Sequence, residues 1–171
     1  YNINPEEIVE VIIEQRPREA INLGNIIIPE DVISAQFSAR FGLALNLIKG
    51  SNGYQDYNEK NIKDPQILDL VKKMKYIPDE KCEKLKVSDG GPALVTIKMK
   101  DGTTYVEQVD YAKGSIQNPM TVEELENKFR SLTSNILPAR RVEAIIRTVQ
   151  GIEELDNINR LAALLVSDGE I

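Results

Sequence analysis

Residues 93–110 read ALVTIKMKDGTTYVEQVD, and this stretch decides the fold class. Apolar and polar residues alternate from Leu94 to Met99, and the alternation resumes after the turn-forming pair Asp101-Gly102. Two alternating segments joined by an Asp-Gly turn are the sequence pattern of a β-hairpin. The stretch therefore predicts two antiparallel strands. Helical patterns on both sides of it make the expected fold class α+β.

A β-branched segment, residues 8–14, predicts a further strand near the amino end. Val9, Val11 and Ile13 occupy every second position, so we expect them to share one face, with the two glutamates on the other. The next segment, residues 16–29, contains proline and glycine. These residues favour turns, and we expect a loop there.

Two helices are expected between this loop and the hairpin. The first runs from Pro29 to Lys49 and ends at Gly50, a favourable helix-terminating residue. The second begins with Asp64 as its N-cap, followed by Pro65. The apolar residues at helical spacing are Phe37, Phe41, Ala44 and Ile48 in the first helix and Ile67, Leu68, Val71 and Met74 in the second.

Helical patterns also follow the hairpin. Thr121 and Glu124 match a capping box, which predicts a helix from this point. Two more apolar repeats at helical spacing come after Pro138, and they comprise Val142, Ile145, Ile146 and Val149, then Ile152, Leu155, Ile158, Leu161 and Leu165. We therefore expect an α+β domain over residues 1–118 and a helical portion over residues 119–171.

The composition of the 171-residue chain excludes several function classes. It has no histidine, so it cannot complete a Ser-His-Asp or Cys-His mechanism alone. Cys82 is the single cysteine, which excludes an internal disulfide and a multi-cysteine zinc site and points to a reducing, cytoplasmic location. The net charge is −6 with scattered basic residues, so we expect no nucleic-acid binding. No apolar run is long enough to span a membrane.

Two motifs resemble the MmgE/PrpD family. The first is SAQFS at residues 34–38, and it is similar to a helix-opening motif of that family. The second is YAKGSIQNPMTVEELENKFR at residues 111–130, and it resembles the family segment PKGSPENPMT…EELEAKFR. Both occur in the family's order, with the hairpin between them. The resemblance covers nearly all 171 residues.

The resemblance implies an architecture. Family members have a large helical domain that is interrupted by a small α+β lid domain, after which the chain returns to the helical domain. This chain matches the lid and the returning C-terminal helices. It begins at Tyr1 without an initiator methionine, and we expect it to be part of a longer polypeptide. The missing N-terminal helical domain would hold the acid/base residues, including the family's histidines.

The resemblance also implies a reaction class. The family includes 2-methylcitrate dehydratase, cis-aconitate decarboxylase and iminodisuccinate epimerase, which act on small polycarboxylic acids without a metal or cofactor. We expect the C-terminal fragment of a 2-methylcitrate dehydratase-like lyase or isomerase that forms one wall of the active site. It should be inactive alone and form a homo-oligomer. The alternatives are a non-catalytic α+β interaction module or one chain of a split enzyme.

Four candidate substrate-binding residues lie in or beside the first motif. The guanidinium of Arg40 is suited to bidentate binding of a carboxylate. Phe41 stands where family members often carry an active-site tyrosine, and it lacks the hydroxyl. Gln36 and Ser38, with Ser34, are placed to bind a carboxylate at a helix N-terminus. The structural alternatives are an exposed arginine, a core phenylalanine and helix-capping serines.

Two further candidates, Lys113 and Ser115, flank Gly114 in the second motif. A glycine-containing loop with a cation and free backbone N–H groups is suited to an anion. The structural alternative is a turn that docks the lid on the helical domain.

Overall fold

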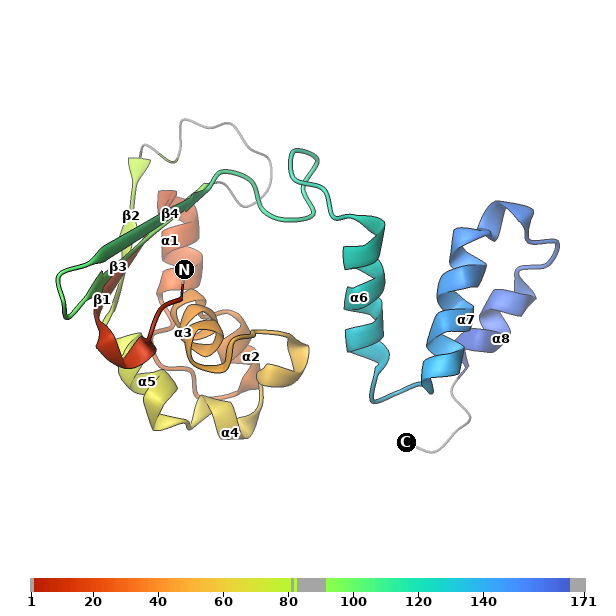
Figure 1. Cartoon of the computed structure of the whole chain (residues 1–171), viewed down its shortest axis with the longest axis horizontal. Helices are drawn as coiled ribbons and strands as arrows, with labels where there is room; N and C mark the ends of the chain where they lie inside the picture. The colour runs from red at the N-terminus through yellow and green to blue at the C-terminus, as the bar shows by residue number, and fades with distance from the viewer. Residues whose placement is uncertain (1, 81, 83–91, 167–171) are drawn as a thin grey trace. The chain divides into compact units, whose positions relative to one another are not determined.

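The computed structural model describes residues 2–80, 82 and 92–166, and the chain divides into two compact units. The first unit spans Tyr1–Asn118 and the second spans Pro119–Ile171 (Figure 1). In the described part of the chain, no helix combines the length and apolar character that crossing a membrane requires.

The first unit is built on a four-stranded sheet with the strand order β2-β1-β3-β4 (Figure 1). Strand β1 pairs in parallel with β2 and antiparallel with β3, which in turn pairs antiparallel with β4. The strands are β1 (Ile8–Gln15), β2 (Met74–Pro78), β3 (Ala93–Met99) and β4 (Thr104–Val109). The α+β fold class and the antiparallel pairing on either side of Asp101-Gly102 are therefore confirmed.

The turn between β3 and β4 is formed by contacts between neighbouring residues. Gly102 has φ +87°, a conformation that favours glycine, and its N–H donates to the carbonyl oxygen of Met99 at 3.1 Å. The carboxylate of Asp101 accepts a hydrogen bond from the N–H of Thr103 at 2.8 Å. All of these contacts lie within five residues, so the local sequence is sufficient to determine them.

Strand β1 departs from simple alternation. Ile8, Val11 and Ile13 are buried, whereas Val9 is 53% exposed. The pairing with β3 shifts register between Ile8 and Glu10. A bulge of this kind turns one residue out of the pleat, so the prediction that Val9 shares a face with Val11 and Ile13 is wrong.

Helix α1 (Pro17–Gly24) occupies the segment that was expected to be a loop. Pro17 stands in its first turn, where the missing N–H is not needed, and Gly24 ends it. A Cβ atom on Gly24 would lie 3.1 Å from the ring of Tyr76 in β2, so any larger residue would require the tyrosine ring to shift by a few tenths of an ångström. The proline and glycine mark the two ends of a helix here, so the loop prediction is wrong for residues 17–24, whereas residues 25–29 do form a loop.

The single helix expected from Pro29 to Lys49 is two helices, α2 (Val32–Gln36) and α3 (Ala39–Lys49). Ser38 is the N-cap of α3, and its hydroxyl accepts a hydrogen bond from the N–H of Phe41 at 3.2 Å. This cap competes with a continuous helix, which explains the break. Helix α3 ends at Gly50 (φ +77°), as predicted.

Three short elements complete the helical layer of the first unit. A 3₁₀ turn spans Tyr54–Asp56, α4 spans Glu59–Ile62, and α5 spans Pro65–Lys72 with Asp64 as its N-cap. A further 3₁₀ turn, Pro5–Glu7, leads into β1. Strand β2 follows α5 directly. It was not expected, because Met74 continues the helical spacing of α5 and was therefore assigned to that helix, whereas it lies in the strand.

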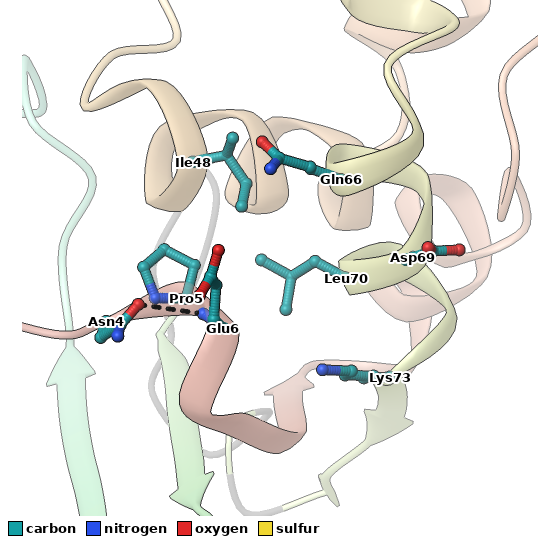
Figure 2. Close-up of a pocket in the computed structure, with 8 residues that line it drawn as sticks. All are labelled: Asn4, Pro5, Glu6, Ile48, Gln66, Asp69, Leu70 and Lys73. Atoms are coloured by element: carbon teal, nitrogen blue, oxygen red, sulfur yellow. Dashed lines mark hydrogen bonds between the residues drawn. The ribbon is translucent and has the colours of Figure 1, made fainter.

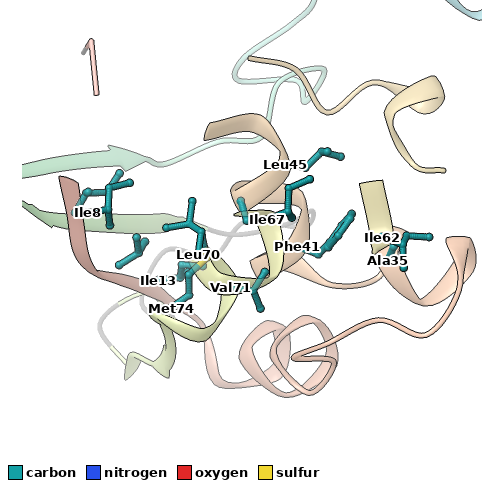
Figure 3. Packing of buried hydrophobic residues seen from close by; sticks show 13 residues of the cluster. Ile8, Ile13, Ala35, Phe41, Leu45, Ile62, Ile67, Leu70, Val71 and Met74 are labelled. Carbon is teal, nitrogen blue, oxygen red and sulfur yellow. The ribbon is translucent and has the colours of Figure 1, made fainter. Parts of the chain in front are cut away.

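The core lies between the sheet and helices α3 and α5 (Figure 3). Burying a large aliphatic or aromatic side chain contributes about 1.5–3 kcal/mol, so this cluster is the main source of stability of the first unit. Its largest fully buried members are Phe41, Ile8, Leu45, Ile67, Val11 and Val71.

The opposite face of the sheet carries charges. Glu10 on β1 pairs with Lys75 on β2 at 2.5 Å and with Lys98 on β3 at 2.7 Å. The hydrogen bonds from these two lysines lower the pKa of Glu10 to about 2. This face is therefore a solvated surface crossed by a three-residue ion-pair ladder.

The second unit contains α6 (Val122–Thr133), α7 (Ala139–Gln150) and α8 (Asn159–Leu165). The capping box is confirmed, because the Thr121 hydroxyl accepts from the N–H of Glu124 at 3.1 Å and the Glu124 carboxylate accepts from the N–H of Thr121 at 2.7 Å. The helical pattern predicted from Ile152 onward is broken at Leu155, which is extended. Asn157 accepts from the N–H of Asn159 at 2.9 Å, and this local turn delays the start of α8.

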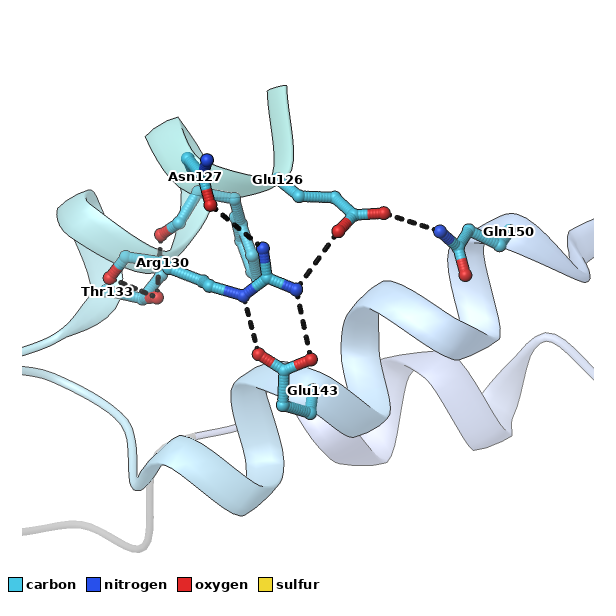
Figure 4. A network of polar contacts seen from close by, with 7 residues as sticks. Glu126, Asn127, Arg130, Thr133, Glu143 and Gln150 are labelled. Carbon is cyan, nitrogen blue, oxygen red and sulfur yellow. Dashed lines mark hydrogen bonds and ion pairs between the residues drawn. The ribbon is translucent and has the colours of Figure 1, made fainter. Parts of the chain in front are cut away.

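A charged network joins α6 to α7 (Figure 4). The Arg130 guanidinium donates to both carboxylate oxygens of Glu143, at 2.6 and 3.1 Å, and to Glu126 at 3.0 Å. Gln150 donates to the other carboxylate oxygen of Glu126 at 2.5 Å. The two glutamates raise the pKa of Arg130 above its ordinary value.

Candidate functional site

Four of the six candidate residues lie at the junction of α2 and α3. Gln36 is the last residue of α2, and Ser38 caps α3, whose first turn contains Arg40 and Phe41. Their exposure differs: Gln36 is exposed, Arg40 is partly buried, Ser38 is 2% exposed and Phe41 is 0% exposed. The junction therefore combines one accessible polar side chain, that of Gln36, with three side chains that are partly or fully buried in the protein.

Arg40 makes its contacts with the protein itself. Its Nη1 donates a hydrogen bond to the carbonyl oxygen of Gly24, and its guanidinium carbon lies 5.9 Å from the ring centroid of Tyr76. Its Nε is buried and has no hydrogen-bond partner within the described residues. Burial lowers the pKa of Arg40. The arginine thus connects α3 with the end of α1 and with β2.

Tyr76 was not a candidate, and no sequence signal distinguishes it from the other tyrosines. Its hydroxyl donates to the side-chain oxygen of Gln15 at the end of β1. Burial, with a smaller effect of the negative charge of Glu19, raises the pKa of Tyr76 to about 12. The phenol remains neutral near pH 7 and acts as a hydrogen-bond donor.

The serine hydroxyls of the first motif are already engaged. The buried Ser38 hydroxyl donates to the carbonyl oxygen of Ile26 at 2.7 Å and accepts from the N–H of Phe41. The Ser34 hydroxyl accepts from the N–H groups of Glu30 and Asp31 at 3.1 and 3.0 Å. Both serines perform the capping and loop-fixing role that was their structural alternative.

Phe41 lies inside the core of the first unit. Its ring centroid is 6.1 Å from that of Tyr57, and the two rings are tilted by 47°. A Cβ atom on Gly42 would lie 3.0 Å from the Tyr57 hydroxyl, so this phenol sits directly against α3. Tyr57 was not a candidate, and only the folded chain brings its ring near Phe41 and its hydroxyl against Gly42.

Lys113 and Ser115 lie in a separate loop between β4 and α6. The N–H of Gly114 donates to the carbonyl oxygen of Asn118 at 2.8 Å, and the N–H of Ser115 donates to that of Ala112 at 3.1 Å. The expectation of free backbone N–H groups here is therefore wrong. The Ser115 hydroxyl accepts from the N–H of Asn118 at 3.2 Å, which closes the loop into a compact turn.

Two cavities of the first unit lie away from all six candidates. A cavity of about 370 Å³ is formed where the first 3₁₀ turn meets α3 and α5 (Figure 2), and it is lined by Asn4, Pro5, Glu6, Ile48, Gln66, Asp69, Leu70 and Lys73. A second cavity, of about 300 Å³, lies at the start of α2 and is lined by Asn25, Ile26, Ile27, Ile28, Glu30, Asp31 and Ser34. None of the six candidates lines either cavity.

Metal-ligating side chains are not clustered. Within residues 2–80, 82 and 92–166, no group of three or more cysteine, aspartate or glutamate side chains is placed to hold a metal ion. Cys82 lies 3.9 Å from a carboxylate oxygen of Asp79. Burial, followed by the charges of Asp79 and Glu14, raises the pKa of Cys82 and keeps its thiol protonated.

Comparison with known proteins assigns the family. Residues 1–154 match the MmgE/PrpD C-terminal domain, which is most of the chain. The chain belongs to the MmgE/PrpD family. The resemblance seen in the two sequence motifs is thereby confirmed.

The curated relatives of this MmgE/PrpD chain are cis-aconitate decarboxylases. The Mus musculus enzyme is 30% identical over 146 residues, covering 80% of this chain and 28% of that protein. The Homo sapiens enzyme is 28% identical over 140 residues, covering 77% of this chain and 27% of that protein. An Aspergillus terreus enzyme is 28% identical over 142 residues, with coverage of 80% and 28%. The chain thus spans less than a third of the length of these relatives.

Proposed function

We propose that this chain is the C-terminal part of a lyase that acts on a small polycarboxylic acid. Decarboxylation of a cis-aconitate-like substrate is the first candidate reaction. The observation that carries the proposal is the similarity to three cis-aconitate decarboxylases over 77–80% of the chain. Dehydration of 2-methylcitrate and epimerisation of iminodisuccinate are the competing reactions of the same family.

The proposed contribution of this chain is one wall of the active site. Decarboxylation leaves negative charge on the substrate and requires a proton donor together with groups that stabilise the anion. Gln36 is exposed and its amide is suited to donating to a substrate carboxylate. Lys113 supplies positive charge from the second motif. Arg40, Ser38, Phe41 and Ser115 support this wall by holding its backbone.

The proton donor is proposed to come from elsewhere in the protein. The chain has no histidine, and the phenol of Tyr76 is engaged with Gln15. The matched relatives are more than three times as long as the matched region. We therefore assign the acid/base residues to an N-terminal helical domain, on the same polypeptide or on a second chain of a split enzyme.

The second unit supports the proposal that this chain is completed by a further helical domain. Helix α6 has an apolar stripe but no buried residue. Its stripe and that of α7 border a groove of about 310 Å³, lined by Val122, Leu125, Glu126, Phe129, Ile145, Ile146, Val149 and Gln150. An apolar groove of this kind favours cover by more protein. The N-terminal helical domain is the proposed partner, within a cytoplasmic homo-oligomer.

The test is an activity screen of the complete polypeptide and of the 171-residue chain. Each is incubated with cis-aconitate, 2-methylcitrate or iminodisuccinate, and the products are followed by NMR. We expect the complete polypeptide to release carbon dioxide from cis-aconitate and the isolated chain to convert none of the acids. Turnover by the isolated chain would contradict the proposal. Absence of turnover of all three acids by the complete polypeptide would favour the non-catalytic interaction module.

A further inference from the structure

The cavity beside the 3₁₀ turn Pro5–Glu7 has a lining that suits a small ligand. Its volume of about 370 Å³ lies within the range of small-molecule sites in proteins. The polar part of the lining includes Glu6 and Lys73, which carry opposite charges (Figure 2). The apolar part consists of Pro5, Ile48 and Leu70. The cavity therefore offers contacts both to an apolar group and to charged groups of one small molecule.

The backbone around this cavity is fixed by the rest of the first unit. Leu70 is 3% exposed and belongs to the core cluster, which holds α5 in place. The carbonyl oxygen of Lys73, just after α5, accepts from the N–H of Val11 in β1 at 3.1 Å. On the other element, the side-chain oxygen of Asn4 accepts from the N–H of Glu6 at 3.2 Å. Both charged positions are thus preorganised, which lowers the entropic cost of binding.

Glu6 and Lys73 each lack a counter-ion among the residues that the structure describes. The Glu6 carboxylate makes no ion pair or hydrogen bond with any of them. The Lys73 ammonium donates to the carbonyl oxygen of Ile8 at 2.7 Å and keeps two further N–H groups for other acceptors. Asp69, the other acid of the lining, already pairs with Lys72 at 2.7 Å. The cavity therefore presents one negative and one positive charge that do not pair with each other.

We propose that this cavity binds a free α-amino acid with an aliphatic side chain. The ammonium of the ligand pairs with Glu6, its carboxylate pairs with Lys73, and its side chain packs against Ile48 and Leu70. A simple amine or a simple carboxylate would leave one of the two charges without a partner, whereas an amino acid satisfies both. The side-chain amide of Gln66 adds donors and an acceptor at the same cavity.

This site is separate from the proposed reaction. None of the six candidate residues of the proposed active-site wall lines the cavity. Binding of an amino acid here therefore goes beyond the proposed function, and either proposal can fail while the other holds.

Titration of the 171-residue chain with L-leucine tests the proposal. Calorimetry gives the dissociation constant, and amide NMR spectra show which residues contact the ligand. We expect a Kd of about 1 mM or tighter, with shifts at Glu6, Gln66 and Leu70. Isopentylamine, which lacks the carboxylate, and isocaproate, which lacks the ammonium, should each bind at least about tenfold more weakly. No binding of leucine, equal affinity for the three compounds, or shifts confined to other parts of the chain would overturn the inference.

Substitutions provide a second test with matched controls. Glu6→Gln and Lys73→Gln each remove one of the two charges and should weaken leucine binding at least about tenfold. Glu59→Gln and Lys60→Gln make the same chemical changes at exposed positions of α4 and should leave the affinity unchanged. Lys73→Gln also loses the hydrogen bond to Ile8, so circular dichroism checks its folding, and Glu6→Gln carries the test if it unfolds. Unchanged affinity in the folded Glu6→Gln variant would refute the proposal.

Discussion

The guanidinium of Arg40 donates a hydrogen bond to the carbonyl oxygen of Gly24, the last residue of α1. Carbonyl groups in the last turn of a helix lack partners within that helix, and a cation is favourable there. The same guanidinium stacks near the ring of Tyr76 on β2. Arg40 therefore links α3, α1 and β2 through one side chain.

Removing this link should destabilise the first unit. Arg40→Ala is expected to lower the free energy of unfolding by about 2 kcal/mol, from the lost charge-assisted hydrogen bond and cation–π contact. Arg40→Lys should recover part of the loss because it keeps the charge. Urea unfolding of the isolated chain measures both. Arg18→Ala, at an exposed position of α1, is the control and should change stability by less than about 0.5 kcal/mol. An Arg40→Ala effect as small as the control would show that the link contributes nothing.

The Ser38 hydroxyl is expected to be structural. Ser38→Ala removes the cap of α3 and leaves the carbonyl oxygen of Ile26 without its donor, so it should cost about 1–2 kcal/mol of unfolding free energy. Chemical denaturation of the isolated chain gives this value. Ser51→Ala removes an exposed hydroxyl bonded to Asp56 and should have a much smaller effect. Equal stability of the two variants would show that the Ser38 hydroxyl contributes no more to the free energy of unfolding than the exposed Ser51 hydroxyl does.

Acid should weaken the first unit through Glu10. The pKa of this carboxyl falls from 4.5 to about 2 on folding, because it accepts hydrogen bonds from Lys75 and Lys98. Its stabilising contribution is therefore complete above about pH 5 and is lost as the pH falls toward 2. Glu10→Gln should be less stable than the parent at neutral pH and close to it at pH 2. Denaturation midpoints across this range measure the difference, with Glu59→Gln at an exposed ion pair as control. A difference independent of pH would argue against the ladder.

The groove between α6 and α7 should promote self-association of the isolated chain. Leu125 lines this groove and is largely exposed, whereas Leu132 lies on the same helix outside the lining. Leu125→Asp should shift the chain toward a monomer, and Leu132→Asp should leave the assembly unchanged. Sedimentation velocity at several concentrations follows the change. A parent chain that is monomeric throughout would contradict the prediction.

Gln36 should affect substrate binding in the complete polypeptide. Losing one hydrogen bond to a carboxylate costs about 1.5–3 kcal/mol, so Gln36→Ala should lower kcat/KM by about tenfold or more. Gln66→Ala, on α5, is the matched control and should have no effect on kinetics. Steady-state assays with the acid that the screen identifies provide the comparison. Equal kinetics for both variants would remove Gln36 from the proposed wall.

Local patterns accounted for the elements that were predicted correctly. The hairpin at Asp101-Gly102, the Asp64 cap of α5 and the Thr121–Glu124 capping box all depend on hydrogen bonds between residues at most four positions apart. Such contacts are available to the chain before any tertiary packing, so the sequence predicts them reliably. The family assignment likewise followed from two motifs of contiguous residues.

Tertiary packing decided the rest. The contact of Gly24 with Tyr76 and the bond from Ser38 to Ile26 join residues 52 and 12 positions apart. These long-range contacts hold the end of α1 against β2 and the loop before α2 against the start of α3. In the folded chain, the hydroxyl of Ser38 and the guanidinium of Arg40 donate hydrogen bonds to backbone carbonyl oxygens of the protein itself. Only the folded chain shows which polar groups have been satisfied internally and which, such as Gln36, remain exposed. The sequence by itself thus determined the family and the local elements, and the packing of distant segments determined which candidate side chains remain accessible to a substrate.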